Sequence, residues 1–307
     1  MRLGLAVMVG LCAAPAFAQA IRVPGTQVTL APPDGFAIAQ QYPGFERADV
    51  RASIMVTELP GPASRMMKGM TTQALASRGM TLISAQSAVV NRRPARLLHV
   101  RQKTSDADAL KWMLIAGDDA RTIMVVGTYS QDAAPGLGEA IQQSLLTTSW
   151  APADTPDPFE GLPFGITPTP KLKLARRVSN MLMFTESGTA GSPGSTEGVF
   201  LVGHSIGKGQ IKDLQSFSEA RAKQTAQLTA LRGFTGSAVQ VDGLDAYELE
   251  VDATDVRSGR PMRLYQVMIP DATGYFIAQG LIRADRAAEM VPEFKAVTKS
   301  FRRTGVR

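Results

Sequence analysis

Apolar and polar residues alternate in several short runs of the chain, and this period of two is typical of half-buried β-strands. In the first half, four such runs follow one another with short turns between them, at residues 83–90, 95–103, 110–116 and 122–129. Apolar residues at helical spacing flank this group at residues 64–78 and 135–147. Consecutive strands with tight turns favour an antiparallel sheet, and we expect the helices to cover its apolar face.

The second half of the chain repeats this order. The matched segments are residues 53–59 with 199–205, 90–100 with 241–251, 111–115 with 263–267, and 123–126 with 275–278. A chain of 307 residues is also long enough for two domains. The sequence therefore predicts an α+β protein of two similar domains, each an antiparallel β-sheet covered by helices.

Proline marks the point where the halves meet. Residues 151–158 read Ala-Pro-Ala-Asp-Thr-Pro-Asp-Pro, and proline cannot donate the hydrogen bonds of a sheet, so an exposed connector is expected there. The predicted organisation is a signal peptide at residues 1–18, a first domain at 19–150, a Pro-rich linker at 151–162 and a second domain at 163–307.

The N-terminal segment has the pattern of a secretory signal peptide. A basic residue precedes an apolar run, and residues 16–18 (Ala-Phe-Ala) form a small-x-small site of the type that signal peptidase cuts. We expect cleavage between Ala18 and Gln19 and a periplasmic or secreted protein. No stretch reaches the ~20 apolar residues of a transmembrane helix, so no membrane span is expected.

Composition excludes two classes of chemistry. Cys12 is the only cysteine and leaves with the signal peptide, which excludes disulfides and thiol chemistry in the mature chain. The net charge of +6 is modest and its basic residues are scattered, so a nucleic-acid partner is not expected.

Residues 30–36 (Leu-Ala-Pro-Pro-Asp-Gly-Phe) combine an opening strand with a Pro-Gly-aromatic turn, and each half ends in a helix that closes on an aromatic residue, Trp150 or Phe301. With the order of elements, this pattern resembles that of PsbP-like proteins and DcrB-type bacterial envelope proteins. The second half departs from the pattern, because residues 174–178 (Leu-Ala-Arg-Arg-Val) replace the Pro-Gly turn. The resemblance implies tandem PsbP-like domains that act as binding or assembly modules.

Gly203-His204-Ser205-Ile206-Gly207 matches the nucleophile motif of serine hydrolases. In that class the catalytic histidine follows the serine along the chain, but no histidine follows Ser205. The alignment places Ser205 at a strand end, opposite Leu59. Ser205 and Lys208 also match a penicillin-binding S-x-x-K motif, whose partner motifs are missing. We expect a glycine-rich loop here and keep a serine hydrolase as an alternative.

Three methionines lie close together at Met66, Met67 and Met70. Exported thioether clusters can bind Cu(I). Met66 and Met70 are four residues apart and would share one side of a helix, which is the spacing that core packing needs. Packing is therefore the preferred interpretation, and copper binding is the alternative.

Opposite charges occupy the strand at residues 95–103 and its copy. Leu98 and Val100 match two apolar residues of the copy and should face the core, so Leu97 and His99 should face outward. The basic set is Arg92, Arg93, Arg96, Arg101 and Lys103, and the acidic set is Glu248, Glu250 and Asp252. Two interpretations stay open: solvated faces that differ by chance, or interaction surfaces that pair between domains, between molecules or with a partner.

Together these features predict an exported, non-enzymatic envelope protein that binds another envelope protein or a polyanionic surface. No catalytic, cofactor or metal site is expected. An interdomain or homodimer contact through the charged strands is a further expectation.

Overall fold

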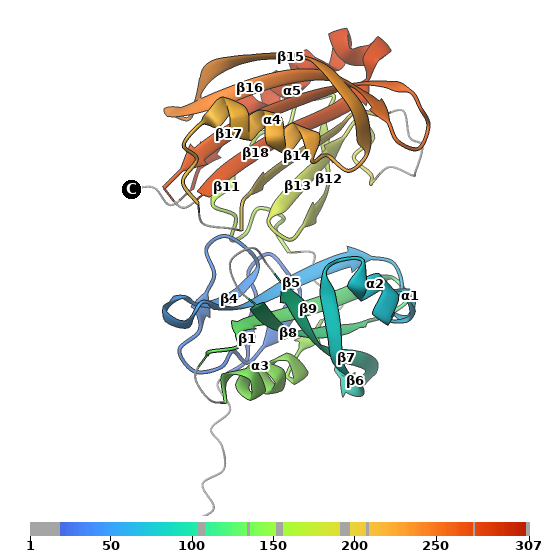
Figure 1. Ribbon diagram of the computed structural model, residues 1–307, viewed down its shortest axis with the longest axis vertical. Helices are drawn as coiled ribbons and strands as arrows, with labels where there is room; N and C mark the ends of the chain where they lie inside the picture. Colours follow the sequence, from blue (N-terminus) through green and yellow to red (C-terminus); the bar gives the residue numbers. More distant parts are fainter. Residues whose placement is uncertain are drawn as a thin grey trace, which may run out of the picture.

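The computed structural model describes residues 19–103, 108–133, 136–151, 156–190, 197–206, 209–272 and 274–304. These residues form two domains, each built on a seven-stranded antiparallel sheet (Figure 1). The predicted α+β fold with two similar sheet domains is confirmed. The predicted signal peptide and Cys12 lie outside the described residues.

The first domain contains one large sheet and three α-helices. Across the sheet the strands are β3 (Ala37–Ile38), β4 (Gly44–Arg47), β5 (Ala52–Pro60), β9 (Arg121–Ser130), β8 (Asp108–Gly117), β7 (Arg93–Lys103) and β6 (Met80–Val90). The helices are α1 (Ala63–Gly69), α2 (Thr72–Ala76) and α3 (Leu137–Leu146), with a 3-10 turn η1 (Ala48–Val50). The four runs predicted as strands at residues 83–129 are β6 to β9.

The second domain has the same strand order. Its sheet runs β12 (Lys173–Val178), β13 (Met181–Thr185), β14 (Val199–His204), β18 (Gly274–Arg283), β17 (Pro261–Asp271), β16 (Leu244–Asp255) and β15 (Leu228–Val241). Its helices are α4 (Leu214–Lys223) and α5 (Ala287–Lys299), with a 3-10 turn η2 (Ala284–Arg286).

Short strands join the beginning of each domain to its end. In the first domain β2 (Val28–Leu30) pairs with both β1 (Ile21–Arg22) and β10 (Ser149–Trp150). In the second, β11 (Phe164–Gly165) pairs with β19 (Arg302–Arg303). Each domain is therefore closed by its own two ends. The aromatic residues near the ends of the two domains, Trp150 and Phe301, are both buried.

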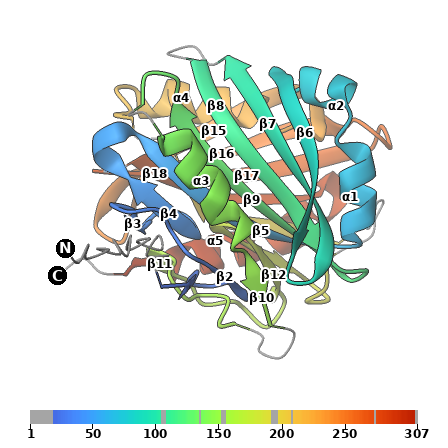
Figure 2. The same ribbon diagram turned by 90° about the horizontal axis from the view of Figure 1, so that it is seen from below.

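Helices cover both faces of each sheet, whereas we had expected a single apolar face. In the first domain α3 crosses one face (Figure 2), and α1 and α2 cover the other. The expectation that Leu97 faces outward is therefore wrong, whereas His99 is partly exposed. Leu97 is 1% exposed on the α3 face, and His99 stacks on Trp112 with 4.2 Å between ring centroids. Strand parity cannot separate core from solvent when both faces are covered.

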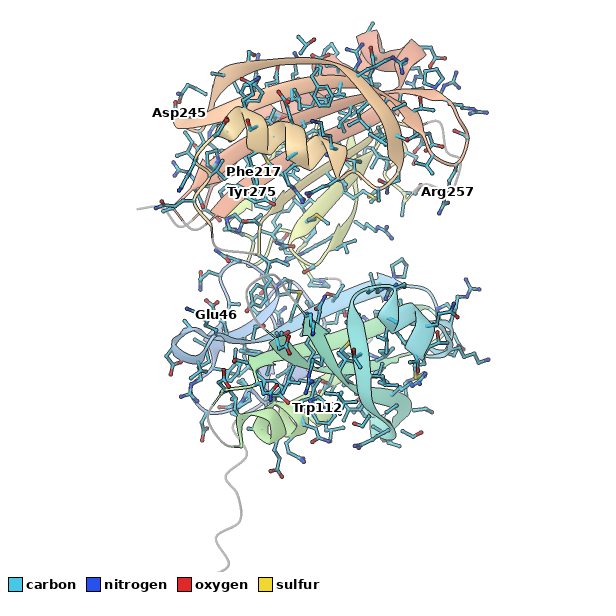
Figure 3. All side chains as sticks on the ribbon, in the orientation of Figure 1. Glu46, Trp112, Phe217, Asp245, Arg257 and Tyr275 are labelled. Carbon is cyan, nitrogen blue, oxygen red and sulfur yellow. The ribbon has the colours of Figure 1, made fainter. Side chains whose placement is uncertain are left out.

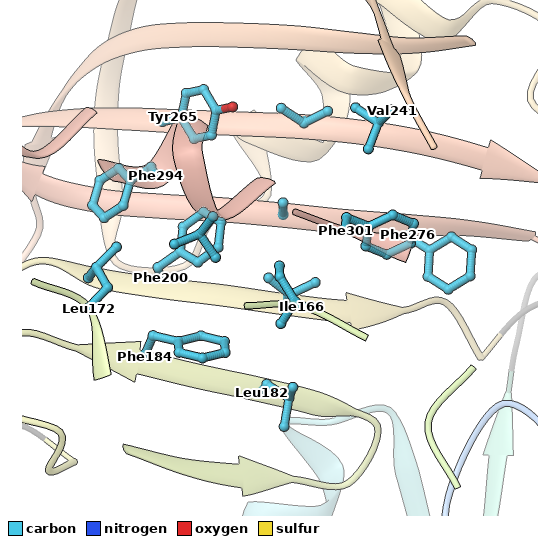
Figure 4. Close-up of a cluster of buried hydrophobic side chains, with 14 of the residues drawn as sticks. Ile166, Leu172, Leu182, Phe184, Phe200, Val241, Tyr265, Phe276, Phe294 and Phe301 are labelled. Atoms are coloured by element: carbon cyan, nitrogen blue, oxygen red, sulfur yellow. The ribbon is translucent and has the colours of Figure 1, made fainter. Parts of the chain in front are cut away.

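Aromatic side chains fill the core between α5 and the second sheet (Figure 4). Phe294 of α5 stacks on Phe200 of β14 with 5.4 Å between ring centroids. Phe301 packs on Phe276 of β18 at 4.9 Å, in a T-shaped arrangement. The opposite face holds a smaller cluster under α4.

The pairing registers correct the sequence alignment of the two halves by one residue on two strands. Leu98 pairs with Met113, and the matching Leu249 pairs with Gln266, so Trp112 corresponds to Tyr265 rather than to Leu264. Glycines confirm this correspondence. Gly127 and Gly280 pair with Trp112 and Tyr265, and each leaves room for a side chain of the helix above it, from α3 and α5 respectively.

The helix predicted at residues 64–78 is two helices. α1 ends at Gly69, and Thr71 begins α2 because its side-chain oxygen accepts the N–H of Ala74. The pattern of apolar residues continues through this break, so periodicity alone did not show it.

Candidate functional site

The acidic side chains of β16 form ion pairs within their own domain. Glu248 lies 2.8 Å from the ammonium group of Lys295, and Glu250 lies 2.9 Å from the same group. Arg263 of β17 contacts Glu250 at 3.1 Å and Asp252 at 2.9 Å. The hydrogen bond that Lys295 donates to Glu248 raises the pKa of Lys295 most, and its bond to Glu250 raises it further. The acidic set is therefore largely neutralised by a helix and a strand that pack beside it.

The basic set of the first domain has a different environment. Arg92, Arg93, Arg101 and Lys103 are exposed, and no ion pair of theirs occurs within the described ranges. Arg96 is half-buried and donates from Nη1 to the backbone oxygen of Met67 at 2.7 Å, on the α1 face. No ion pair joins β7 to β16 among the residues described. The positive charge of β7 therefore remains directed at solvent.

Beside β7 lies β6, an exposed edge strand that the sequence analysis did not single out. In the described part of the chain, no strand pairs with the outer side of β6. Its 11 residues include no charged residue and no proline. Ile83 is 49% exposed and Val89 is 73% exposed. Edge strands usually carry Lys, Pro or strong bulges that prevent pairing with another chain, and β6 has only one register shift, between Leu82 and Ser84.

The equivalent edge of the second domain is built differently. β15 carries two register shifts in its pairing with β16. Positive φ angles at Ala230 (50°) and Gly233 (62°) bend its first half. Such distortions make an edge a poor template for another strand. The two edges therefore differ in both geometry and neighbouring charge.

Ser205 lies one residue beyond β14, at the strand end that the alignment predicted. Its Oγ accepts the N–H of Tyr275 at 3.0 Å, and its own N–H donates to the carbonyl of Tyr275 at 2.8 Å. The ring of Tyr275 packs against Phe217 of α4 at 5.1 Å (Figure 3). The serine thus extends the β14–β18 pairing. Gly207 and Lys208, which complete the two catalytic motifs, lie outside the described residues.

His204 points into the second core. Its side chain is 1% exposed, its ring lies 4.4 Å from that of Phe276, and its Nε2 lies 3.5 Å from a carboxylate oxygen of Asp271. Burial lowers the pKa of His204 below its usual 6.5, and Asp271 opposes this shift. His99 belongs to the other domain, where its Nε2 lies 3.0 Å from the hydroxyl of Tyr129.

The methionine cluster packs on the α1 face of the first sheet. Met70 is 4% exposed and lies in a cluster with Leu75, Leu98 and others, and Met66 and Met67 pack against that cluster. The sulfur of Met70 accepts from Nη1 of Arg78 at 3.8 Å. The spacing of four residues did predict a shared contact surface, since the N–H of Met70 still makes the helical hydrogen bond to the carbonyl of Met66 at the end of α1.

Metal-binding groups and membrane-spanning helices are both absent from the described ranges. No group of three or more His, Cys, Asp or Glu side chains there is arranged to hold a metal ion. No helix in those ranges is long and apolar enough to cross a membrane.

No protein-family model and no curated protein matches the chain. Solved structures do show similarity. The PsbP protein CyanoP of Synechocystis sp. PCC 6803 is 16% identical over 47% of this chain and 99% of its own, with a TM-score of 0.30. LpqN of Mycobacterium tuberculosis, involved in cell envelope biogenesis, is 14% identical over 45% of this chain and 81% of its own, with a TM-score of 0.29.

The apo T6SS immunity protein TplEi of Pseudomonas aeruginosa covers more of the chain. It is 10% identical over 92% of this chain and 96% of its own, with a TM-score of 0.35. The likenesses to the PsbP protein and to LpqN are at low identity, cover about half of this chain and have TM-scores of about 0.3.

Proposed function

We propose that this chain is an exported, non-enzymatic binding protein of the cell envelope, made of tandem PsbP-like domains. Its binding surface is the edge strand β6 with the neighbouring basic strand β7. The partner is a protein that contributes an extended segment carrying Asp or Glu side chains. The observation that carries this proposal is the exposed, uncharged edge of β6 beside an unneutralised basic strand.

Strand addition explains this combination of features. A partner segment that pairs with β6 would satisfy the outward backbone N–H and C=O groups of the edge. Between residues 79 and 103 the chain has five basic residues and no acidic one, so acidic side chains on the partner would be attracted to the same place. Backbone pairing then supplies affinity, while charge selects the partner.

A second copy of the chain fits this surface less well. Two β6 edges brought together would place two sets of the same five basic residues side by side, and like charges repel. The acidic β16 of another molecule is also a weak partner, because Lys295 and Arg263 already neutralise it. An external acidic segment meets neither obstacle.

Site-specific photo-crosslinking tests the proposal. A photoreactive benzoylphenylalanine replaces Val89 on the β6 edge, and the matched control carries it at Val256, an exposed position of the second domain (58%). After illumination in cells of the source organism, we expect a covalent adduct from position 89 and none from 256. Mass spectrometry should locate the adduct in an acidic, extended segment of another envelope protein.

Two variants separate strand addition from simple charge attraction. Ile83→Pro blocks the edge at the register shift, where Ile83 has no partner residue in β7. Arg92→Glu/Arg93→Glu/Arg101→Glu reverses the charge, and at about 0.5 kcal/mol for each exposed contact it should weaken binding about tenfold. The control of equal charge change reverses three exposed residues of the second domain: Arg257, Arg260 and Lys299.

We expect both β6–β7 variants to lose the adduct and the control to keep it. An adduct that survives Ile83→Pro but not charge reversal would overturn strand addition in favour of a polyanionic surface. An adduct with a second copy of this chain, with a basic segment, or no adduct at all would overturn the proposed partner.

A further inference from the structure

A cavity of about 380 Å³ lies between the two domains. β5 of the first domain, β12 of the second and the connector all contribute side chains to its wall. Its apolar wall is made of side chains from all three parts: Pro43, Val56, Pro156, Pro158, Leu174 and Ala175. The volume is within the range of small-molecule sites and has room for on the order of ten water-sized groups.

Arg177 of β12 provides the main polar group of this cavity. Its Nε donates to the carbonyl of Ser179 at 2.7 Å, and its Nη1 donates to the carbonyls of Glu160 and Pro158 at 2.5 and 3.2 Å. These bonds hold the guanidinium in one orientation, against Gly25 of the first domain. Its Nη2 is fully buried and has no partner within the described ranges.

Two other donors on this wall are in the same state. The Nε of Arg176 and the hydroxyl of Ser179 are buried without a partner in the described part of the chain, and both residues line the cavity. A buried N–H or O–H group that makes no hydrogen bond costs about 1–3 kcal/mol. Three such donors around one cavity indicate an acceptor that enters it.

The charges around the cavity have one positive charge in excess. Glu160 is paired with Arg22 and accepts the N–H of Gly25 at 3.0 Å. Glu58 is paired with Arg121 at 3.4 Å. Burial raises the pKa of Glu58 and lowers that of Arg177 to about 10, which still leaves the guanidinium charged at neutral pH.

Asp157 is the third carboxylate near Arg177, and its Oδ1 accepts the N–H of Phe159 at 2.9 Å. The groups near the cavity therefore carry four positive charges and three negative ones. The positive charges are those of Arg22, Arg121, Arg176 and Arg177, and the negative charges are those of Glu58, Glu160 and Asp157. A buried charge without a counterion is costly, so one further negative charge would stabilise this arrangement.

We infer that the interdomain cavity binds a small organic monoanion, namely a carboxylate joined to an apolar body of about ten non-hydrogen atoms. The carboxylate accepts from Nη2 of Arg177 and from the donors of Arg176 and Ser179. The apolar body lies against the proline and aliphatic wall. A fatty acid and the free carboxyl terminus of a peptide share this chemistry. The site is separate from the β6 edge and does not depend on the proposed function.

Calorimetric titration and thermal shift of the purified mature chain test this inference. The probes are octanoate, octanol, which has the same apolar body without the charge, and N-acetyl-Ala-Leu with a free carboxylate. We expect at least one of the two carboxylates to bind with 1:1 stoichiometry and to raise the melting temperature, and octanol to bind at least tenfold more weakly. Whichever carboxylate binds more tightly identifies the source of the ligand.

Three variants locate the binding. Arg177→Met removes the charge, and Ala175→Leu fills the cavity while leaving every donor in place. Both should lose binding at least tenfold. Because Arg177 also holds the connector, Ala175→Leu keeps the test valid if Arg177→Met is poorly folded. Arg257→Met is the matched control, since it removes an exposed arginine of the second domain that does not line the cavity, and it should bind normally.

Equal affinity for octanoate and octanol would overturn the inference. So would the failure of both octanoate and N-acetyl-Ala-Leu to bind. Binding that persists in Ala175→Leu would place the ligand elsewhere and overturn it as well.

Discussion

Gly280 is the position where the second domain has least room for a side chain beneath α5. A Cβ atom placed there would lie 2.3, 2.6 and 2.7 Å from Cδ2, Cε2 and Cγ of Phe294. Ordinary contacts begin near 3.4 Å, so the ring would have to move by about 1 Å. The ring is fully buried, stacked on Phe200 at 5.4 Å and close to Tyr265 at 6.2 Å, so it cannot move alone.

We therefore expect Gly280→Ala to destabilise the second domain by about 2 kcal/mol, within the usual cost of overpacking a core. For a domain of this size, that free energy lowers the melting temperature by about 4–8 °C. Replacing Phe294 by Leu removes the ring that the new methyl group meets. In the Phe294→Leu background the same glycine substitution should cost at least about 1 kcal/mol less, a coupling that a double-mutant cycle measures.

The positions of the tryptophans make the two domains separable in one experiment. Both tryptophans of the chain, Trp112 and Trp150, lie in the first domain, so their fluorescence follows its unfolding alone. Far-UV circular dichroism follows both domains. Gly280→Ala should shift the dichroism transition of the second domain and leave the tryptophan transition in place.

Gly127→Ala is the matched control in the first domain. Its Cβ would meet one close atom, Cγ2 of Ile141 at 2.1 Å, with the next atoms at 3.5 Å or beyond, so a smaller shift is expected, now in tryptophan fluorescence. The reasoning is refuted if Gly280→Ala leaves the second transition unchanged, moves the tryptophan transition equally, or is additive with Phe294→Leu.

Three further predictions concern the sites weighed from the sequence. Ser205→Ala should lower stability by only about 1 kcal/mol, the loss of one hydrogen bond, and a fluorophosphonate probe should not label wild-type protein at this serine; labelling that disappears in the variant would contradict this. Burial lowers the pKa of His204, so the unfolded chain takes up the proton first and the second domain should lose stability as pH falls below about 6.5. The loss between pH 7.5 and pH 5 should be smaller in His204→Gln, and an equal loss in both proteins would exclude this residue as a cause. A variant in which leucine replaces Met66, Met67 and Met70 should stay folded, because Leu for Met exchanges usually cost under about 1.5 kcal/mol. It should compete for Cu(I) against a chromogenic chelator no differently from wild type. A stoichiometric difference between the two proteins would favour copper binding by these methionines.

Hydrophobic alternation was sufficient to predict most strands and the doubling of the architecture. The predicted strand at residues 95–103 is β7, which begins two residues earlier, and the helix predicted at residues 135–147 is α3 at Leu137–Leu146. Both are long, strongly patterned segments whose period is clear without tertiary information.

The register between the halves could not be obtained in the same way. Each sheet is covered on both faces, so shifting the alignment of β8 and β9 by one residue still places apolar residues over apolar residues. The pairing partners, such as Leu98 with Met113, separate the two alignments. The glycines Gly127 and Gly280 were a usable signal that the first alignment missed.

The charged strands show a related limit. The sequence shows the acidic residues of β16 as a set, but their partners Arg263 and Lys295 come from a neighbouring strand and a later helix. The missed edge of β6 did have a sequence signal, since residues 80–90 contain no charge and no proline. Its position at the border of the sheet depends on strand order, which one sequence does not give.

The pairing of β10 with β2 and of β19 with β11 also fixes an order of events during synthesis. The first domain has all of its strands once Trp150 has emerged, so it can fold while the second is still being made. The second domain must wait for Arg302 and Arg303 before its own closing pair can form. β12, which carries Arg177, belongs to the sheet of the second domain, so the cavity between the domains is completed only after that later domain has formed.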